Sequence, residues 1–195
     1  MKKLRVLVLM HESLVPPDSL TGYTPQQNEV WKTEYDVMAF LREAGHEVRA
    51  LGLYDNLAEL RNEITSWQPD VAFNLLQEFQ GIVTYDQHIV AFLELMRQPY
   101  TGCNPRGMML SRDKVLTKQL MAWHRIPTPQ FALFRRERPY RLSAKLRYPL
   151  FVKSATEDAS LGISQASIVE DRVRLCQIID FIHEAYGLEV SPGSF

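Results

Sequence analysis

Residues 4–10, LRVLVLM, have the length and apolar composition of a buried β-strand. Apolar side chains at helical spacing follow at residues 29–43, and residues 47–51 form a second apolar segment of strand length. A second helical pattern at residues 57–67 leads to a third strand at residues 70–75. This β-α-β-α-β alternation predicts a parallel sheet with helices on both faces.

The loops that follow the first and third strands are candidate ligand-binding segments. Open α/β sheets bind ligands at the carboxyl ends of their strands. Here those ends lead into a polar loop at residues 11–28 and into residues 77–85. A loop as long as the first is uncommon unless it is functional or disordered.

The pattern changes in the C-terminal part of the chain. After helices at residues 86–96 and 113–124, short strands alternate with basic segments and a long helix. The expected elements are strands at residues 131–134, 149–153 and 163–166 and a helix at residues 170–186. This arrangement is α+β, and we place the domain boundary near Ser111, which gives domains 1–110 and 111–195.

The composition excludes several classes of partner. The chain has 195 residues, 46% of them hydrophobic, and a formal net charge of −1 at pH 7. Near-neutral charge gives no reason to expect nucleic acid or an anionic membrane as partner. No apolar stretch approaches the ~20 residues that span a bilayer. Cys103 and Cys176 lack metal-ligand spacing, which indicates reduced thiols in a cytoplasmic protein.

Lys153 closes an apolar strand and precedes a loop of small and polar residues, SATEDASLG at 154–162. An ammonium group at the end of a buried strand needs an anionic partner. The loop could offer backbone N–H groups to a phosphate, to which the lysine adds a point charge. The alternative is a hairpin loop with a snorkelling lysine. The segment lacks the glycines of the P-loop and of the dinucleotide fingerprint, which disfavours both classes.

A second candidate segment is SRDKVLTK at residues 111–118. Ser111 suits the N-cap of a helix, and Asp113 suits its first turn. Lys114 is unfavourable at a helix N-terminus, which is weak evidence that it pairs with an anionic group. A solvated helix face explains the same residues.

Four ordered segments together resemble the D-alanine–D-alanine ligase branch of the ATP-grasp enzymes. They are QPYTG from Gln98, DKVLTK from Asp113, IPTPQF from Ile126 and YPLFVKSATEDASLG from Tyr148. Their order and spacing agree from about Val71 to Glu184, and more loosely from residue 1. The resemblance implies an N-terminal parallel sheet flanked by helices, the pre-ATP-grasp domain, followed by a small α+β ATP-grasp subdomain.

The resemblance also implies an activity and roles for individual residues. Family members are ATP-dependent carboxylate–amine ligases, which form a peptide-type bond through an acyl phosphate. Their two phosphate-binding lysines fall on Lys114 and Lys153. The loop that closes over the triphosphate falls on residues from Glu157 to Gly162, with Ser160 facing phosphate. The two lysines would stabilise the negative charge that develops on the phosphoryl group during transfer. The closed loop would exclude water, which hydrolyses the acyl phosphate.

The substrate positions depart from the family pattern. The family's glycine-rich turn after the first strand is replaced by residues 11–28, and Glu29 stands roughly where a substrate-seating glutamate belongs. The alternative for Glu29 is that it simply opens a helix. Gln77 replaces a substrate-site histidine, and Ala159 replaces one of the loop's paired serines. These departures affect the acceptor pocket more than the phosphate site. The sequence therefore does not identify the two small-molecule substrates, a carboxylate and an amino acid.

The C-terminal tail, residues 191–195, follows the helix that precedes the second ATP-grasp lobe in the family. The resemblance implies ATP and Mg²⁺ as cofactors, but no later acidic cluster could hold magnesium, so this chain offers no metal ligands. The tail also does not resemble the hydrophobic strand expected next. We therefore expect a truncated form, without the second lobe, that has little ligase activity alone. The alternative is a non-catalytic ATP-grasp remnant that binds a ligand or partner. A missing lobe would leave apolar surface bare and favour a homo-oligomer.

Overall fold

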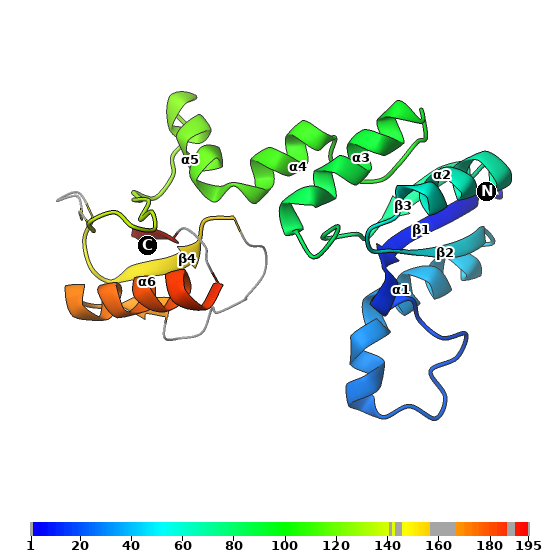
Figure 1. The fold of residues 1–195 in the computed structure, drawn as a ribbon, viewed down its shortest axis with the longest axis horizontal. Coiled ribbons are helices and arrows are strands. Elements are labelled where there is room, and N and C mark those ends of the chain that lie inside the picture. Colours follow the sequence, from blue (N-terminus) through cyan, green and yellow to red (C-terminus); the bar gives the residue numbers. More distant parts are fainter. Residues whose placement is uncertain (1, 141, 143–145, 157–166, 187–189, 195) are drawn as a thin grey trace. The chain divides into compact units, whose positions relative to one another are not determined.

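The computed structural model describes residues 2–140, 142, 146–156, 167–186 and 190–194. The chain divides into two compact units, Met1–Met108 and Met109–Phe195. The division lies close to the boundary expected between residues 110 and 111. Each unit has its own hydrophobic core. Figure 1 shows the helices and strands of both units.

The first unit is built on a parallel three-stranded sheet in the order β2-β1-β3. Its strands are β1 (Arg5–His11), β2 (Glu47–Leu53) and β3 (Val71–Asn74). Its helices are α1 (Pro25–Glu43), α2 (Leu57–Trp67) and α3 (Asp86–Leu95), with 3₁₀ turns η1 (Glu12–Leu14) and η2 (Val83–Tyr85). Helix α4 (Pro105–Arg112) crosses the division between the units. The predicted parallel sheet is confirmed.

The central strand β1 contributes side chains to two separate clusters, because its side chains alternate between the faces of the sheet. Leu7 and Leu9 are fully buried in one cluster with Leu60 of α2 and Leu93 of α3. Val6, Val8 and Met10 belong to a second cluster, which contains Met38 of α1. Helices therefore cover both faces of the sheet, as the alternation predicts.

Helix α1 begins at Pro25, so the sequence-based start at residue 29 is wrong. Thr24 is the N-cap: its hydroxyl accepts from the Gln27 N–H at 3.3 Å, and the Gln27 carbonyl Oε1 accepts from the Thr24 N–H at 2.9 Å. This capping box and a proline at the first helical position make a strong start signal. Glu29 consequently lies inside the helix and does not open it.

The polar loop after β1 is held close to β2 at Gly52. A Cβ atom at this position would lie 2.6 Å from Val15 Cγ2 and 2.9 Å from Glu12 Cα. We expect Gly52→Ala to lower the free energy of unfolding by about 1–3 kcal/mol, because the backbone of η1 must move to admit the methyl group. Urea denaturation followed by circular dichroism measures this change.

A partial rescue serves as the control for Gly52→Ala. Adding Val15→Ala removes the nearer clash but leaves Glu12 Cα in place, so the double variant should recover only part of the loss. Unchanged stability in Gly52→Ala alone would show that η1 moves without cost and would contradict the packing argument.

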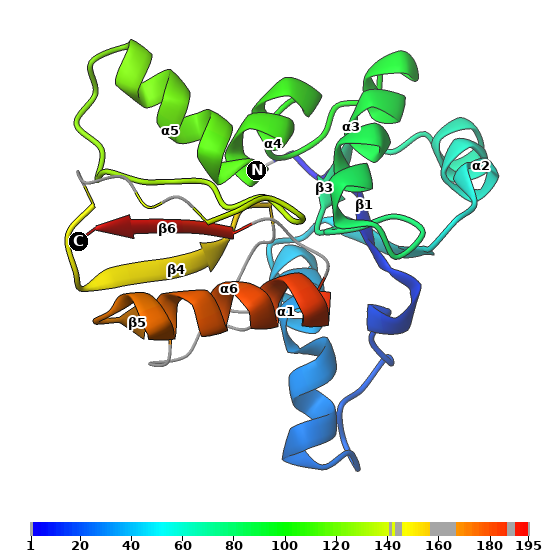
Figure 2. The ribbon, with the colours of Figure 1, turned by 60° about the vertical axis from the view of Figure 1, so that its left-hand side comes forward.

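The second unit is an antiparallel sheet in the order β5-β4-β6, covered on one face by a helix. Its elements are α5 (Lys114–Trp123), β4 (Leu150–Ser154), β5 (Ile168–Val169), α6 (Arg172–Tyr186) and β6 (Val190–Ser194). Helix α6 runs along β4 (Figure 2). Its residues Leu175 and Ile179 belong to the same buried cluster as Leu150 and Val152 of β4. The predicted α+β arrangement is confirmed.

The C-terminal tail forms strand β6, so the expectation that it lacks a strand is wrong. The strand pairs with β4 along its length and forms bridges to Phe131 and Phe134 on its other side. Pro192 is tolerated there, and its carbonyl accepts from the Ala132 N–H at 3.1 Å. Pairing on both sides thus stabilises a strand in a segment with little hydrophobic character. The continuous strand predicted at residues 131–134 is wrong, because these residues form only isolated bridges to β6. The strand predicted at residues 163–166 lies outside the described residues.

Candidate functional site

A cavity in the second unit has a volume of about 660 Å³ and three lysines in its wall. Its lining comes from the end of α4, from α5, from residues 128–129 and from two neighbouring strands, β4 and β6. The lining residues are Ser111, Lys114, Thr117, Lys118, Met121, Thr128, Pro129, Phe151, Lys153, Ser191 and Gly193. The two lysines singled out from the sequence, Lys114 and Lys153, therefore lie in the wall of one cavity.

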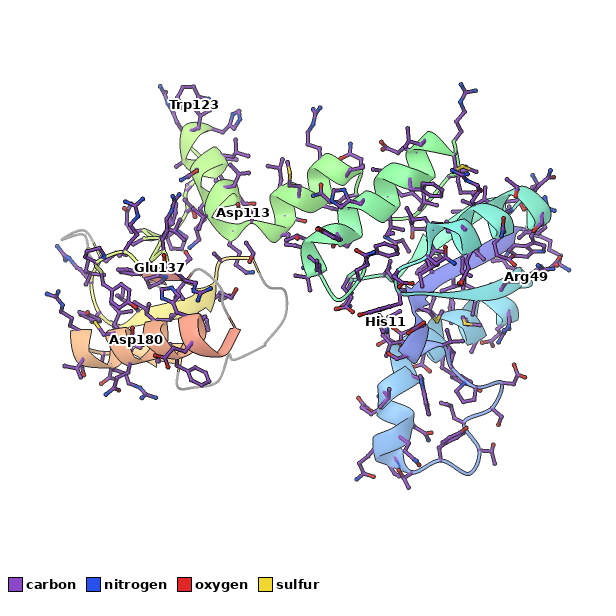
Figure 3. All side chains as sticks on the ribbon, in the orientation of Figure 1. His11, Arg49, Asp113, Trp123, Glu137 and Asp180 are labelled. Atoms are coloured by element: carbon purple, nitrogen blue, oxygen red, sulfur yellow. The ribbon has the colours of Figure 1, made fainter. Side chains whose placement is uncertain are left out.

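The start of α5 fixes the position of Lys114. Asp113, labelled in Figure 3, is the N-cap of this helix. Its Oδ1 accepts from the N–H groups of Val115 at 3.0 Å and Leu116 at 2.8 Å. The proposed cap, Ser111, instead belongs to α4, so that assignment is wrong. The Lys114 N–H donates to the carbonyl of Ala155, which directly follows β4, at 3.0 Å. This bond ties the start of α5 to the strand that carries Lys153.

The floor of the cavity is one face of the β4–β6 pair. Lys153 lies opposite Ser191 in the antiparallel register, and Phe151 lies opposite Gly193. Residues directly opposite each other point to the same face of an antiparallel pair. The intervening residues Leu150 and Val152 point to the other face, which α6 covers.

The described lining of the cavity contains three lysines. None of the lining residues that the structure describes is an aspartate or a glutamate. Burial lowers the pKa of Lys118, and the charge of Lys153 lowers it further. The lysine ammonium groups also lie near aromatic rings: Lys118 Nζ is 5.2 Å from the Phe131 centroid, and Lys153 Nζ is 5.0 Å from the Phe151 centroid. Such a wall suits a polyanion that brings its own negative charge.

The sequence analysis missed Lys118 and Ser191 as site residues. Lys118 stands four positions after Lys114, so both lie on one face of α5, a spacing visible in the sequence. Ser191 could not be found in this way, because its place depends on the pairing of β6 with β4. The proposed loop residues Glu157, Ser160 and Gly162 lie outside the described residues.

The proposed substrate residues belong to the first unit. Glu29 is exposed on α1, with a carboxylate oxygen 3.8 Å from Lys32 Nζ. Gln77 is exposed in the segment that follows β3. At the carboxyl ends of the strands, His11 Nε2 lies 3.3 Å from Glu78 Oε1. The His11 ring also meets the ring of Tyr54 edge to face, with centroids 5.5 Å apart. The sequence analysis did not single out this group.

No metal centre is apparent in the described part of the chain. Among these residues, no group of three or more histidine, cysteine, aspartate or glutamate side chains is placed to hold a metal ion. None of the described helices combines the length and the hydropathy that crossing a membrane requires.

Comparison of the sequence with known proteins identifies relatives that include several D-alanine–D-alanine ligases. No family model matches the chain. It is 34% identical to a D-alanine–D-alanine ligase of Marinomonas over 129 residues, 65% of the chain and 40% of that protein. A D-alanine–D-alanine ligase of Syntrophotalea carbinolica is 32% identical over 155 residues, 79% of the chain and 47% of that protein. An uncharacterized protein of Sinorhizobium fredii, y4sG, is 32% identical over 83% of the chain and 49% of its own length. The chain spans about half the length of the curated relatives that it matches.

Solved structures give the same relationship at the level of fold. A crystal structure of a Bacillus anthracis D-alanine–D-alanine ligase complexed with ATP matches 98% of the chain and 58% of its own, with a TM-score of 0.70 and 21% identity. The VanG D-Ala:D-Ser ligase of Enterococcus faecalis matches the whole chain and 63% of its own, with a TM-score of 0.64 and 17% identity. Over the part that it shares with them, this chain is a relative of the D-alanine–D-alanine ligases of the ATP-grasp superfamily.

Proposed function

We propose that this chain carries the phosphate-binding lobe of an ATP-dependent carboxylate–amine ligase. The observation that supports this function is the cavity in which Lys114, Lys118 and Lys153 meet without an acidic residue in its described lining. The Bacillus anthracis ligase that shares this fold was crystallised with ATP. A nucleotide triphosphate fits a site that is cationic on one side and has apolar residues such as Met121 and Phe151 on the other.

In the proposed reaction, the terminal phosphoryl group of ATP passes to a carboxylate oxygen, and ADP leaves. An amine then attacks the acyl carbon, loses a proton and displaces phosphate, which leaves a peptide-type bond. Lys114 and Lys153 would contact the phosphate oxygens and stabilise the negative charge that moves between them. The proposed reaction would use small-molecule substrates and would take place in the cytoplasm.

Other parts of the proposal rest on the resemblance alone. Residues from Glu157 to Gly162, including Ser160, would close over the triphosphate and exclude water. Glu29 and Gln77 would contribute to the binding of the carboxylate or amino-acid substrate. Mg²⁺ would neutralise part of the triphosphate charge, and the described part of this chain supplies lysines rather than ligands for it.

The test of this proposal is a series of nucleotides titrated calorimetrically against the chain. Affinity should rise from AMP to ADP to ATP, because each added phosphate brings negative charge to the lysines. Lys153→Ala should weaken ATP binding by about tenfold or more, as expected when a charged hydrogen-bond partner is lost. It should also reduce the difference between ATP and ADP.

The matched control is Lys3→Ala, which removes an exposed lysine next to β1 and should leave all three affinities unchanged. Equal binding of ATP by the wild type and Lys153→Ala would contradict the assignment of Lys153. Equal binding of AMP and ATP by the wild type would contradict a polyphosphate site altogether.

A further inference from the structure

Lys118 lies in the wall of the cavity, close to the Phe131 ring and to Gly193 of β6. It lies four residues after Lys114 on α5 and is half-buried. Its ammonium nitrogen lies 5.2 Å from the centroid of the Phe131 ring. On the β6 side, a Cβ atom at Gly193 would come within 3.2 Å of the same nitrogen. The absence of a side chain at Gly193 thus leaves the space that the Lys118 ammonium group occupies.

The charged groups that face Lys118 are all positive in the described part of the unit. Lys114 precedes it on its own helix, and Lys153 comes from β4. Strand β6 offers Ser191 and Gly193, and the segment before β4 offers the Phe131 ring. No ion pair joins Lys118 to a carboxylate among the described residues. A half-buried amine close to the charge of Lys153, with no carboxylate paired to it among the described residues, is unfavourable until an anion enters.

Ser191 adds a second group that lacks a partner. Its side chain lines the same cavity, opposite Lys153 in the sheet register. The residue is only 5% exposed, and its buried hydroxyl oxygen has no hydrogen-bond partner among the described residues. Because a buried hydroxyl without a partner is costly, such a group in the wall of a cavity indicates a contact that a ligand completes.

We infer that Lys118 and Ser191 complete the polyphosphate site: the Lys118 ammonium group donates to the same anion as Lys114 and Lys153, and the Ser191 hydroxyl donates to it beside Lys153. This inference rests on the proposed function, which makes the ligand a nucleotide triphosphate. It adds a third cation, placed by Gly193 and Phe131, and a neutral donor that the sequence motifs do not identify.

The protonation of Lys118 should therefore be linked to ligand binding. Burial, and then Lys153, lower the pKa of Lys118 in the empty cavity, and a bound anion should raise this pKa again. Affinity is then greatest below the pKa of the empty site and falls as the pH rises through it. An arginine at this position would stay protonated and remove the dependence.

The experiment compares three variants by calorimetric titration with ATP and with inorganic triphosphate. Lys118→Met should weaken both ligands by about tenfold or more, while Lys118→Arg should bind them nearly as well as the wild type. The pH dependence is measured with ATP, whose terminal phosphate has lost its second proton above about pH 7.5 because the second pKa of a phosphate ester is about 6. Between about pH 7.5 and pH 9.5, wild-type affinity for ATP should fall more steeply than that of Lys118→Arg. Ser191→Ala should weaken binding severalfold without lowering the urea midpoint, since the lost hydroxyl has no partner in the empty site.

The outcomes separate this inference from the proposed function. If Lys153→Ala weakens triphosphate binding while Lys118→Met and Ser191→Ala bind like the wild type, the inference fails and the proposed function stands. If the wild type binds no triphosphate, both fail. A pH dependence that persists unchanged in Lys118→Arg would overturn the role of Lys118, and a lower urea midpoint in Ser191→Ala would show a structural role for that hydroxyl.

Discussion

Reversal of charge at Lys153 is expected to reduce the affinity for ATP by about a hundredfold or more. In Lys153→Glu the attraction between an ammonium group and phosphate is lost and a repulsion replaces it. Two unit charges 4 Å apart interact by about 4 kcal/mol near a protein surface. Salt and the exposure of Lys153 weaken this interaction, so we expect a loss of ~3 kcal/mol of binding free energy. This loss corresponds to about a hundredfold change in affinity. The new carboxylate would also attract the Lys118 ammonium group, whose pKa already responds to the charge at position 153.

The matched control for this reversal is Lys3→Glu. It changes the net charge of the chain by the same amount at an exposed position of the other unit, and it should leave ATP affinity unchanged. Both titrations belong at about 0.15 M salt, where the Debye length is near 8 Å and distant charges are screened. An equal loss of affinity in both variants would show that overall charge, rather than the lysine cavity, governs binding. Wild-type affinity in Lys153→Glu would exclude this cavity as the phosphate site.

The fold of the first unit could be predicted from the sequence because its periodicities are local. The apolar run of β1, the helical spacing of α2 and the stop at Pro69 each report one element, and their alternation determines a parallel sheet. The start of α1 could also have been predicted. Thr24 and Pro25 carry both halves of a helix start signal, within a segment whose polar composition predicts a loop.

Strand β6 could not be predicted from local sequence patterns. A strand between two partners is stabilised by pairing on both sides, so its own composition says little about it. Val190 is buried, and both its N–H and its carbonyl group pair with Phe134, whereas Pro192 and Gly193 would be taken for a turn. Without β6 in the prediction, neither the floor of the cavity nor Ser191 could be placed.

Only part of the candidate site could be predicted from the sequence, for a related reason. Lys114 and Lys153 are far apart in the chain, and nothing in their spacing says that they meet. Their proximity follows from the hydrogen bond between the Lys114 N–H and the Ala155 carbonyl, so only the resemblance to a family could suggest it from the sequence. Lys118 is different, because its spacing from Lys114 already places both on one helix face.

Leu93 and Leu95 of α3 offer a sharp test of the core of the first unit. Leu93 is fully buried in the cluster that contains Leu7 and Trp67, whereas Leu95 is 82% exposed. Leu93→Ala should lower the free energy of unfolding by about 2–5 kcal/mol, because it removes buried methyl groups and leaves a cavity. Leu95→Ala makes the same chemical change on the same helix and should stay within about 0.5 kcal/mol of the wild type.

Urea denaturation followed by tryptophan fluorescence measures this pair of variants. Trp67 is 7% exposed within the same cluster as Leu93, so its emission should report the loss of this core, whereas Trp123 in the other unit is 83% exposed and should change little. Because both variants carry the same substitution, differences in helix propensity and in the unfolded chain largely cancel, and the remaining difference measures burial. Comparable destabilisation by the two variants would mean that Leu95 is buried in the protein in solution, and that the outer face of α3 packs against another surface.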